Sequence, residues 1–442
     1  MITSLDLILF LVYTIILIIF GLYVNQRFVK DSVLQVYLIP FLIFKIFCSL
    51  AFCLIMTYYY PDKNDTFGYW NFSTSIYNYY LSSDNSISIL DILFAPTDYL
   101  KTLPNIPTYT FALDKGYLIV VKFAFLLRFI GANSFLVTSL VFGFICFLCT
   151  ILLYKTLRSI YPEYSRAIAW IVFFVPSVTF WSSGIMKDTI TFSCICLLNW
   201  AIINIFYHRR NFIISLIIIS FAVYLVFFVK TYILVGLLPA LLILIFRLFL
   251  FKIKDFHLKL FVFPITLAFL IVATLASYKF INIYASKFSI DRVVRAAQVM
   301  QNWHLTLAKR EDASSYDLGK IEMTPKGIAT MGFKSYVVTF FRPYLWEVRN
   351  PVMLMTAVES FLILIATFYI LLRSGIIFTL RKILSDPFLL YAIIFTIVFG
   401  IAVGFASFNF GALARYKIPC VPFYLMILLV CHYSIPISKL KL

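Results

Sequence analysis

Long apolar runs recur along the whole chain and are separated by polar segments. The runs are roughly 17–25 residues long, which is the length of helix needed to cross about 30 Å of hydrocarbon. Helices are the expected form because backbone groups in lipid must be hydrogen-bonded within the membrane segment. The pattern therefore predicts an all-α polytopic transmembrane helix bundle with about eleven spans. They cover residues 5–24, 34–58, 135–154, 164–181, 189–207, 211–229, 233–250, 260–278, 351–372, 388–407 and 418–435.

Two long polar regions interrupt this pattern, and the first ends in an unusual apolar segment, Gly116–Ile130. This segment contains Lys122 and Arg128, and charged side chains are costly inside hydrocarbon. We therefore expect an interfacial helix here, lying along the membrane surface, rather than another crossing.

The chain 1–442 is predicted to be a single integral membrane domain with two extended outer-face loops. The first loop covers residues 59–131 and includes the interfacial helix, and the second covers residues 279–350. Loops of this length are uncommon in compact domains unless they have a function. The functional site is therefore expected at the outer face of the membrane.

Composition and charge support a membrane protein and orient it. The chain is 63% hydrophobic with a mean hydropathy of +0.97, which excludes a water-soluble fold. It has 37 Lys and Arg against 19 Asp and Glu, and most of the cations lie in short connections between predicted spans. Such loops are typical of the cytoplasmic side, so the charge needs no nucleic-acid partner. The amino terminus is expected outside and the carboxyl terminus in the cytoplasm.

Two carboxylates, Asp62 and Asp65, stand where the second predicted span ends. One of them could act as a general base toward a hydroxyl group, while the other orients that group or helps to hold a divalent cation. The alternative is that Asn64, Asp65 and Thr66 only form a cap or turn where the helix leaves the membrane. We predict Asp65 as the main catalytic residue and Asp62 as a secondary one.

Several charged residues at predicted outward span ends could bind an anionic substrate. Lys187 and Asp188 are adjacent, and Lys230 lies at the next outward end. A lysine there is a point charge suited to a phosphate, and Asp188 could orient a polar substrate. The alternative for Lys187 and Asp188 is a self-neutralising helix start.

A second group of candidate binding residues lies near the end of the chain, at Arg342, Glu347, Arg415 and Lys417. Arginine forms forked hydrogen bonds to phosphate, so Arg342 and its aromatic neighbours could hold a lipid phosphate. The alternative is an aromatic belt with cations that reach the membrane surface. The chain has only four histidines and no glycine-rich phosphate loop, so neither a histidine metal cluster nor a nucleotide-driven motor is expected.

The layout of most of the chain resembles the C-type (GT-C) polytopic membrane glycosyltransferases. The similarity is carried by the acid-bearing stretch Asn64–Tyr69, the interfacial helix that follows, and the run Pro176–Asp188. One departure is that the acidic loop follows the second predicted span, whereas the family usually places it after the first. Two other stretches, Phe341–Glu347 and Gly411–Pro419, look more like bacterial surface-polysaccharide proteins, including repeat-unit polymerases.

The resemblance implies an enzyme of the bacterial inner membrane that moves a sugar from a polyprenyl-phosphate-linked donor to a glycan or lipid-linked acceptor in cell-envelope glycan synthesis. Membrane lipid is then the other partner. An O-antigen or repeat-unit polysaccharide polymerase is the first alternative. A lipid-linked oligosaccharide flippase is an alternative from another class, and it would require a charged path at mid-membrane depth. Lys45 is the only obvious start of such a path.

Overall fold

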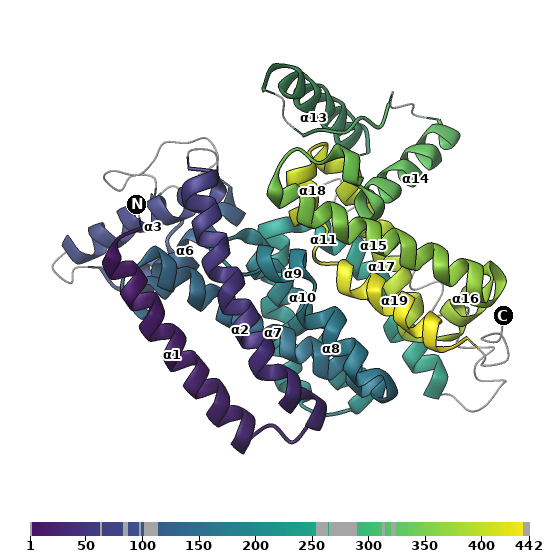
Figure 1. Cartoon of the computed structure of the whole chain (residues 1–442), viewed down its shortest axis with the longest axis horizontal. Coiled ribbons are helices and arrows are strands. Elements are labelled where there is room, and N and C mark those ends of the chain that lie inside the picture. The colour runs from purple at the N-terminus through teal and green to yellow at the C-terminus, as the bar shows by residue number, and fades with distance from the viewer. Residues whose placement is uncertain are drawn as a thin grey trace. The chain divides into compact units, whose positions relative to one another are not determined.

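The computed structural model describes residues 2–61, 64–82, 87–96, 99–100, 114–252, 264, 290–311, 314–319 and 324–435. Apart from one isolated β-bridge between Ser315 and Asn409, the secondary structure of these residues is helical (Figure 1). Their contacts divide the chain into two compact units, Met1–Thr231 and Tyr232–Leu442. Each unit is built from packed apolar helices, as expected for a multi-pass membrane protein.

The first unit is organised around α2 and α7. Its elements are α1 (Ser4–Arg27), α2 (Ser32–Leu54) with a π-helical extension (Ile55–Tyr59), α3 (Asp65–Ser82), α4 (Ile89–Phe94), α6 (Lys115–Ile130), α7 (Phe135–Ile160), a 3-10 turn (Pro162–Tyr164), α8 (Ser165–Phe173), α9 (Pro176–Trp181), α10 (Lys187–Ile203) with a second π-helical extension (Asn204–His208), and the first part of α11 (Phe212–Lys252). Helix α7 packs against both α2 and α10, while α1 packs on α2 and α7 at the edge of the unit (Figure 1). Helices α1 and α2 pack closely at Gly21, where a Cβ atom would lie 2.6 Å from Leu42 Cδ2 and the leucine side chain would have to shift.

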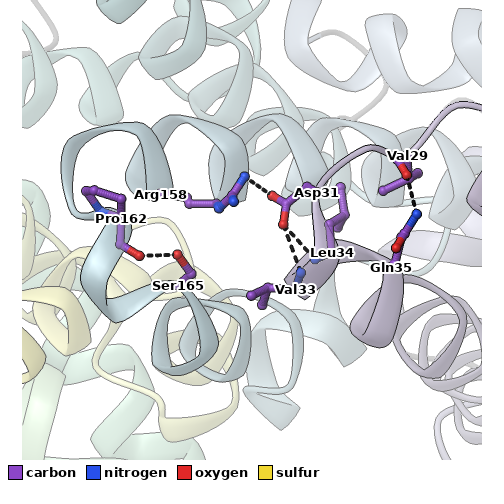
Figure 2. Close-up of polar contacts among 8 residues, drawn as sticks. All are labelled: Val29, Asp31, Val33, Leu34, Gln35, Arg158, Pro162 and Ser165. Carbon is purple, nitrogen blue, oxygen red and sulfur yellow. Dashed lines mark hydrogen bonds and ion pairs between the residues drawn. The ribbon is translucent and has the colours of Figure 1, made fainter.

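At one end of the first unit, Asp31 connects the start of α2 to the end of α7 (Figure 2). One oxygen of Asp31 accepts hydrogen bonds from the backbone N–H groups of Val33 and Leu34, both at 3.0 Å, and so caps the first turn of α2. The other oxygen forms an ion pair with Arg158 in the last turn of α7. A contact of 3.0 Å between His208 Nε2 and Ser159 Oγ brings the end of the α10 segment to the same place.

Replacing Asp31 with alanine is expected to lower the stability of the protein by about 1–2 kcal/mol, because it removes a helix cap together with an ion pair. Asp31→Asn is the matched control, since asparagine caps a helix equally well but carries no charge. Thermal unfolding in detergent should therefore rank wild type and Asp31→Asn close together and Asp31→Ala clearly below them. Equal unfolding midpoints for Asp31→Ala and wild type would contradict the capping role.

The second unit contains the remainder of α11, then α13 (Ile290–Glu311), α14 (Pro325–Phe341), a 3-10 turn (Leu345–Glu347), α15 (Pro351–Ser374), α16 (Ile376–Ser385), α17 (Pro387–Ser407), α18 (Phe410–Tyr416) and α19 (Val421–Tyr433). Its closest helix pair is α14 with α17. Glycines on α17 allow this approach, since a Cβ atom at Gly404 would lie 2.2 Å from Ser335 O. Thr339 Oγ1 also donates a hydrogen bond of 2.7 Å to Gly400 O.

Most of the predicted spans that fall on described residues are present as long apolar helices. Among the described residues, seven helices are long and apolar enough to cross a membrane, or eight if α18 and α19 form one broken span. Residues 260–278, which carry another predicted span, lie outside the described residues. The predicted count of about eleven is therefore not confirmed, whereas the multi-pass character is.

Two of the predicted spans are interrupted by proline. The predicted span 164–181 is two short helices, α8 and α9, because Pro176 disfavours helical backbone at Val175, which has φ −71° and ψ 115°. The predicted span 418–435 contains the 13-residue helix α19, which is bent by 67° from α18. The break between them covers residues 417–420 and includes Pro419, which has no backbone N–H to continue a helix.

The predicted spans 211–229 and 233–250 correspond to two helical stretches of α11 that meet at a kink. Lys230 has non-helical angles, φ −151° and ψ 76°, inside this element. The predicted division point therefore coincides with a sharp irregularity in the backbone.

The two regions predicted as outer-face loops, 59–131 and 279–350, contain helices where the structure describes them, and their place outside the membrane stays a prediction. In the first region, α3, α4 and α6 are helices, and in the second α13 and α14 are. Helix α6 has 16 residues and is about 24 Å long, shorter than the hydrocarbon core of a bilayer. Its interfacial position stays a prediction, and so do the sides assigned to the termini.

Candidate functional site

Five charged residues meet in the first unit at the starts of three helices and at the irregularity in α11. We call this group the polar corner, and its members are Asp65, Asp114, Lys187, Asp188 and Lys230. The first turns of helices carry unpaired backbone N–H groups, which favour negative charge nearby. The polar corner therefore combines carboxylates, ammonium groups and helix amino ends.

A buried contact joins the first turns of α3 and α10. Thr66 Oγ1 donates to Met186 Sδ at 3.0 Å, so Asp65, one residue earlier, and Lys187, one residue later, belong to adjoining turns. Asn64 caps α3, since its Oδ1 accepts the N–H of Phe67 at 2.9 Å. Asp65 is left exposed at the start of the helix. The capping function that competed with catalysis in the sequence is thus performed by Asn64.

Helix α6 contributes Asp114 to the polar corner. Asp114 Oδ2 accepts a hydrogen bond from Lys187 Nζ at 2.7 Å, while its Oδ1 caps the N–H of Gly116 at 3.3 Å. The glycine permits close packing on α11, because a Cβ atom there would lie 2.5 Å from Phe228 O. The Lys187–Asp114 pair is partly open to solvent, with side-chain exposures of 22% and 57%. A ligand could therefore reach both groups.

The Asp188–Lys230 pair forms the buried floor of the polar corner. Lys230 Nζ lies 2.5 Å from Asp188 Oδ1, and the side chains are only 6% and 3% exposed. Removing two charges from water is costly, so a pair in such a place must remain matched. The irregular backbone of Lys230 lies where α11 passes this pair, and non-helical angles inside a helix are typical of functional sites.

The polar corner and the Asp31 end lie at opposite ends of the same helices. Helix α2 starts at the Asp31 end and leads to Asn64, whose Nδ2 donates to Met56 O at 3.1 Å. The α10 segment runs in the other direction, from Lys187 to His208. This opposition agrees with the charge pattern, which assigns basic connections and the Asp65 stretch to different faces of the membrane.

The second unit holds a separate charged group, the Arg342 cluster, which consists of Arg342, Glu347, Ser360 and Lys417. Arg342 forms a forked pair with Glu347, in which Nε donates to Oε2 at 3.0 Å. Ser360 Oγ donates to Arg342 O at 3.1 Å and accepts from Lys417 Nζ at 2.8 Å. Lys417 is fully buried, at the break between α18 and α19, and the Glu359 carboxylate is close enough to interact with its charge.

The structure thus brings the predicted binding residues together in two groups. In the first unit Lys187 and Lys230 form ion pairs with Asp114 and Asp188, and Asp65 lies on the turn that adjoins Lys187 through the Thr66–Met186 contact. In the second unit Arg342 pairs with Glu347, and Lys417 bonds to Ser360 beside them. Arg415 lies on α18, the helix that also carries Phe410, whose ring is 5.2 Å from the Arg342 guanidinium.

Asp62 lies outside the described residues, so the suggested divalent cation at Asp62 and Asp65 stays a prediction. Elsewhere in the part of the chain that the structure describes, no group of three or more His, Cys, Asp or Glu side chains could hold a metal ion.

Sequence reasoning missed three residues of these groups: Asp114, Glu359 and Ser360. Asp114 was one of several acids in a long polar region, and nothing local distinguished it. Glu359 did carry a signal, because it is the only acid in the apolar run of α15, where an ionisable residue usually has a function. Ser360 had no such signal, since serine is common in membrane helices.

Two buried cations outside these groups have structural partners. Lys45 Nζ donates to Ser182 O and Ser182 Oγ at 2.8 and 2.7 Å, so it caps the end of α9. Arg128 stacks on Trp70, with 3.5 Å between its guanidinium carbon and the ring centroid, and donates to Thr74 Oγ1 at 2.6 Å. Both therefore hold helices together.

Comparison with known protein families, with characterised proteins and with solved structures gives no match to this chain. The chemistry of the site must therefore be argued from its own residues. An exposed carboxylate and a partly exposed lysine on adjoining turns are groups that can take up a proton and hold an anion. The Asp188–Lys230 pair adds a buried ion pair to the same helix ends.

Proposed function

We propose that the protein is a membrane glycosyltransferase that moves a sugar from a polyprenyl-phosphate-linked donor to an acceptor hydroxyl at the outer face of the membrane. The observation that carries the proposal is the contact between Thr66 and Met186, because it joins the turn bearing Asp65 to the turn bearing Lys187. Displacement of a phosphate by a hydroxyl needs these two kinds of group, a proton acceptor and a cation.

In the proposed step, the acceptor oxygen attacks the anomeric carbon of the sugar. Asp65 takes the proton of the acceptor hydroxyl as the new carbon–oxygen bond forms. The bond between the anomeric carbon and the phosphate oxygen breaks, and the lipid phosphate departs with the electron pair. Lys187, which remains 22% exposed beside Asp114, stabilises the negative charge that develops on this phosphate.

The second unit holds a separate set of predicted binding residues. Arg342 and Arg415 remain candidates for binding an anionic group of a lipid-linked substrate. In the Arg342 cluster, Glu347 holds the guanidinium in a forked pair with an Nε–Oε2 distance of 3.0 Å, and such a fork is well suited to phosphate when an anion takes the place of the carboxylate.

A repeat-unit polysaccharide polymerase with an arginine-based site is the second candidate. The observation that favours it is the Arg342 cluster, where a buried lysine and an arginine share Ser360 within 3.1 Å. A flippase has less support, because Lys45, the predicted start of a charged path, is bonded to the end of α9.

Separate substitution of Asp65 and Arg415 distinguishes the two enzymes. The purified protein would be placed in vesicles with a donor carrying a labelled sugar, and the transfer of label to acceptor would be measured. For the glycosyltransferase, Asp65→Asn should abolish most of the transfer, because the proton acceptor is lost. For the polymerase, Arg415→Gln should do so while Asp65→Asn retains full activity. If neither substitution reduces the transfer, both assignments fail.

A further inference from the structure

Helix α16 (Ile376–Ser385) connects two helices that are each long enough to span a membrane, α15 and α17. The chain leaves α15 through Gly375, whose φ of +81° favours glycine, and enters α17 through Asp386, which caps its first turn. With ten residues, α16 is about 15 Å long, too short to cross a bilayer. Because both its ends are tied to spanning helices, α16 must lie close to the membrane surface.

The two faces of α16 differ in the way expected of a helix that lies in a membrane interface. An apolar stripe at spacing i, i+4, i+8 faces outward, with exposures of 62% for Ile376, 52% for Leu380 and 57% for Leu384. Thr379 and Ile383, which border this stripe on one side, are buried, and Thr379 Oγ1 contacts Ser374 Oγ at 2.8 Å. The outward stripe is thus not needed to pack this unit.

The charged residues around α16 are mostly basic. Arg381 is exposed and Lys382 is partly exposed on the helix itself, and Arg373 lies in the last turn of α15. Arg247 of α11 donates from Nη2 to Leu384 O at 2.7 Å, while Asp386 is the acid of the connection. The Nε of Arg373 is buried without a hydrogen-bond partner.

We propose that α16, together with Arg373, Arg381 and Lys382, binds the head groups of anionic phospholipids. The apolar stripe would enter the boundary of the acyl chains, and the three cations would contact lipid phosphates beside it. The inference is independent of glycosyl transfer, since it concerns the surrounding lipid and not the polar corner.

The test measures the lipid preference of the full chain in phosphatidylcholine vesicles. The association of spin-labelled phosphatidylglycerol is compared with that of spin-labelled phosphatidylcholine, for wild type and for the double variant Arg381→Gln/Lys382→Gln. Each basic residue near a lipid surface is worth about fivefold in association. The preference for phosphatidylglycerol should therefore fall by about fivefold for each charge removed, and added salt should weaken it in wild type.

The matched control removes two exposed cations from α13 and α14, in the variant Arg295→Gln/Lys326→Gln. It changes the net charge equally, so it should keep the preference of wild type. Equal losses in the two double variants would overturn the proposal, because they would show a general effect of charge. An unchanged preference in Arg381→Gln/Lys382→Gln would also overturn it, leaving these cations to orient the chain only. Neither result depends on a transfer assay.

Discussion

Replacing Lys230 with methionine is expected to lower the free energy of unfolding by about 3–5 kcal/mol, because Asp188 would remain buried without its cation. The two charged atoms are 2.5 Å apart, and neither side chain is more than 6% exposed. Methionine has a similar length and leaves the backbone of residue 230 free to keep its angles. The loss would be seen as a lower midpoint of thermal unfolding in detergent.

The double variant Lys230→Met/Asp188→Leu tests whether the loss of stability comes from the unpaired charge of Asp188. Replacing both members of a buried ion pair with apolar groups is often neutral or stabilising by about 1–4 kcal/mol, so most of the lost stability should return. A single variant within about 0.5 kcal/mol of wild type would contradict burial of the pair, since surface substitutions have effects of that size.

The membrane-spanning helices were the most predictable part of this fold. The predicted span 351–372 is α15 (Pro351–Ser374), and the predicted span 388–407 is α17 (Pro387–Ser407). Their lengths are fixed by the thickness of the bilayer, and their starts carry local signals, with Asn350 and Asp386 as caps before a proline. These signals lie in neighbouring residues, so the sequence is sufficient to predict where both helices begin and end.

Helix α14 shows why other elements escaped prediction. It contains Lys326 and Lys334 and has no long apolar run, so the sequence predicts a polar loop there. It packs on α17, where Gly400 leaves room for the Phe340 side chain and Gly404 for the backbone of Ser335. A contact between residues about sixty positions apart in the chain leaves no periodic pattern that points to its partner.

The residues of the candidate site were partly predictable from the sequence, but their pairing was not. Lys187, Asp188 and Lys230 were found because charged residues at the ends of apolar runs are conspicuous. The pairing itself was not found, because Lys187 joins Asp114 and Lys230 joins Asp188 across different helices. Long-range ion pairs are determined by packing. The sequence shows only that Lys187 and Asp188 are adjacent, which is equally consistent with a self-neutralising helix start.

Asp65→Asn is expected to reduce sugar transfer by about 10²–10⁴-fold, because general base catalysis typically contributes that much. The fold should be unaffected, since Asp65 is exposed and Asn64 supplies the cap of α3. Asp65→Glu keeps a carboxylate in the same turn and should retain more activity than Asp65→Asn. Asp91→Asn is the matched control, because Asp91 is a fully exposed acid that caps α4 and lies outside the polar corner.

The most direct test of this account is the rate of a single turnover of labelled sugar from a polyprenyl-phosphate donor to its acceptor, in vesicles containing equal amounts of folded protein. The account predicts transfer by wild type and by Asp91→Asn at the same rate, and a rate at least about 10²-fold lower for Asp65→Asn. Transfer by Asp65→Asn at the rate of wild type would contradict the central claim that Asp65 is the proton acceptor.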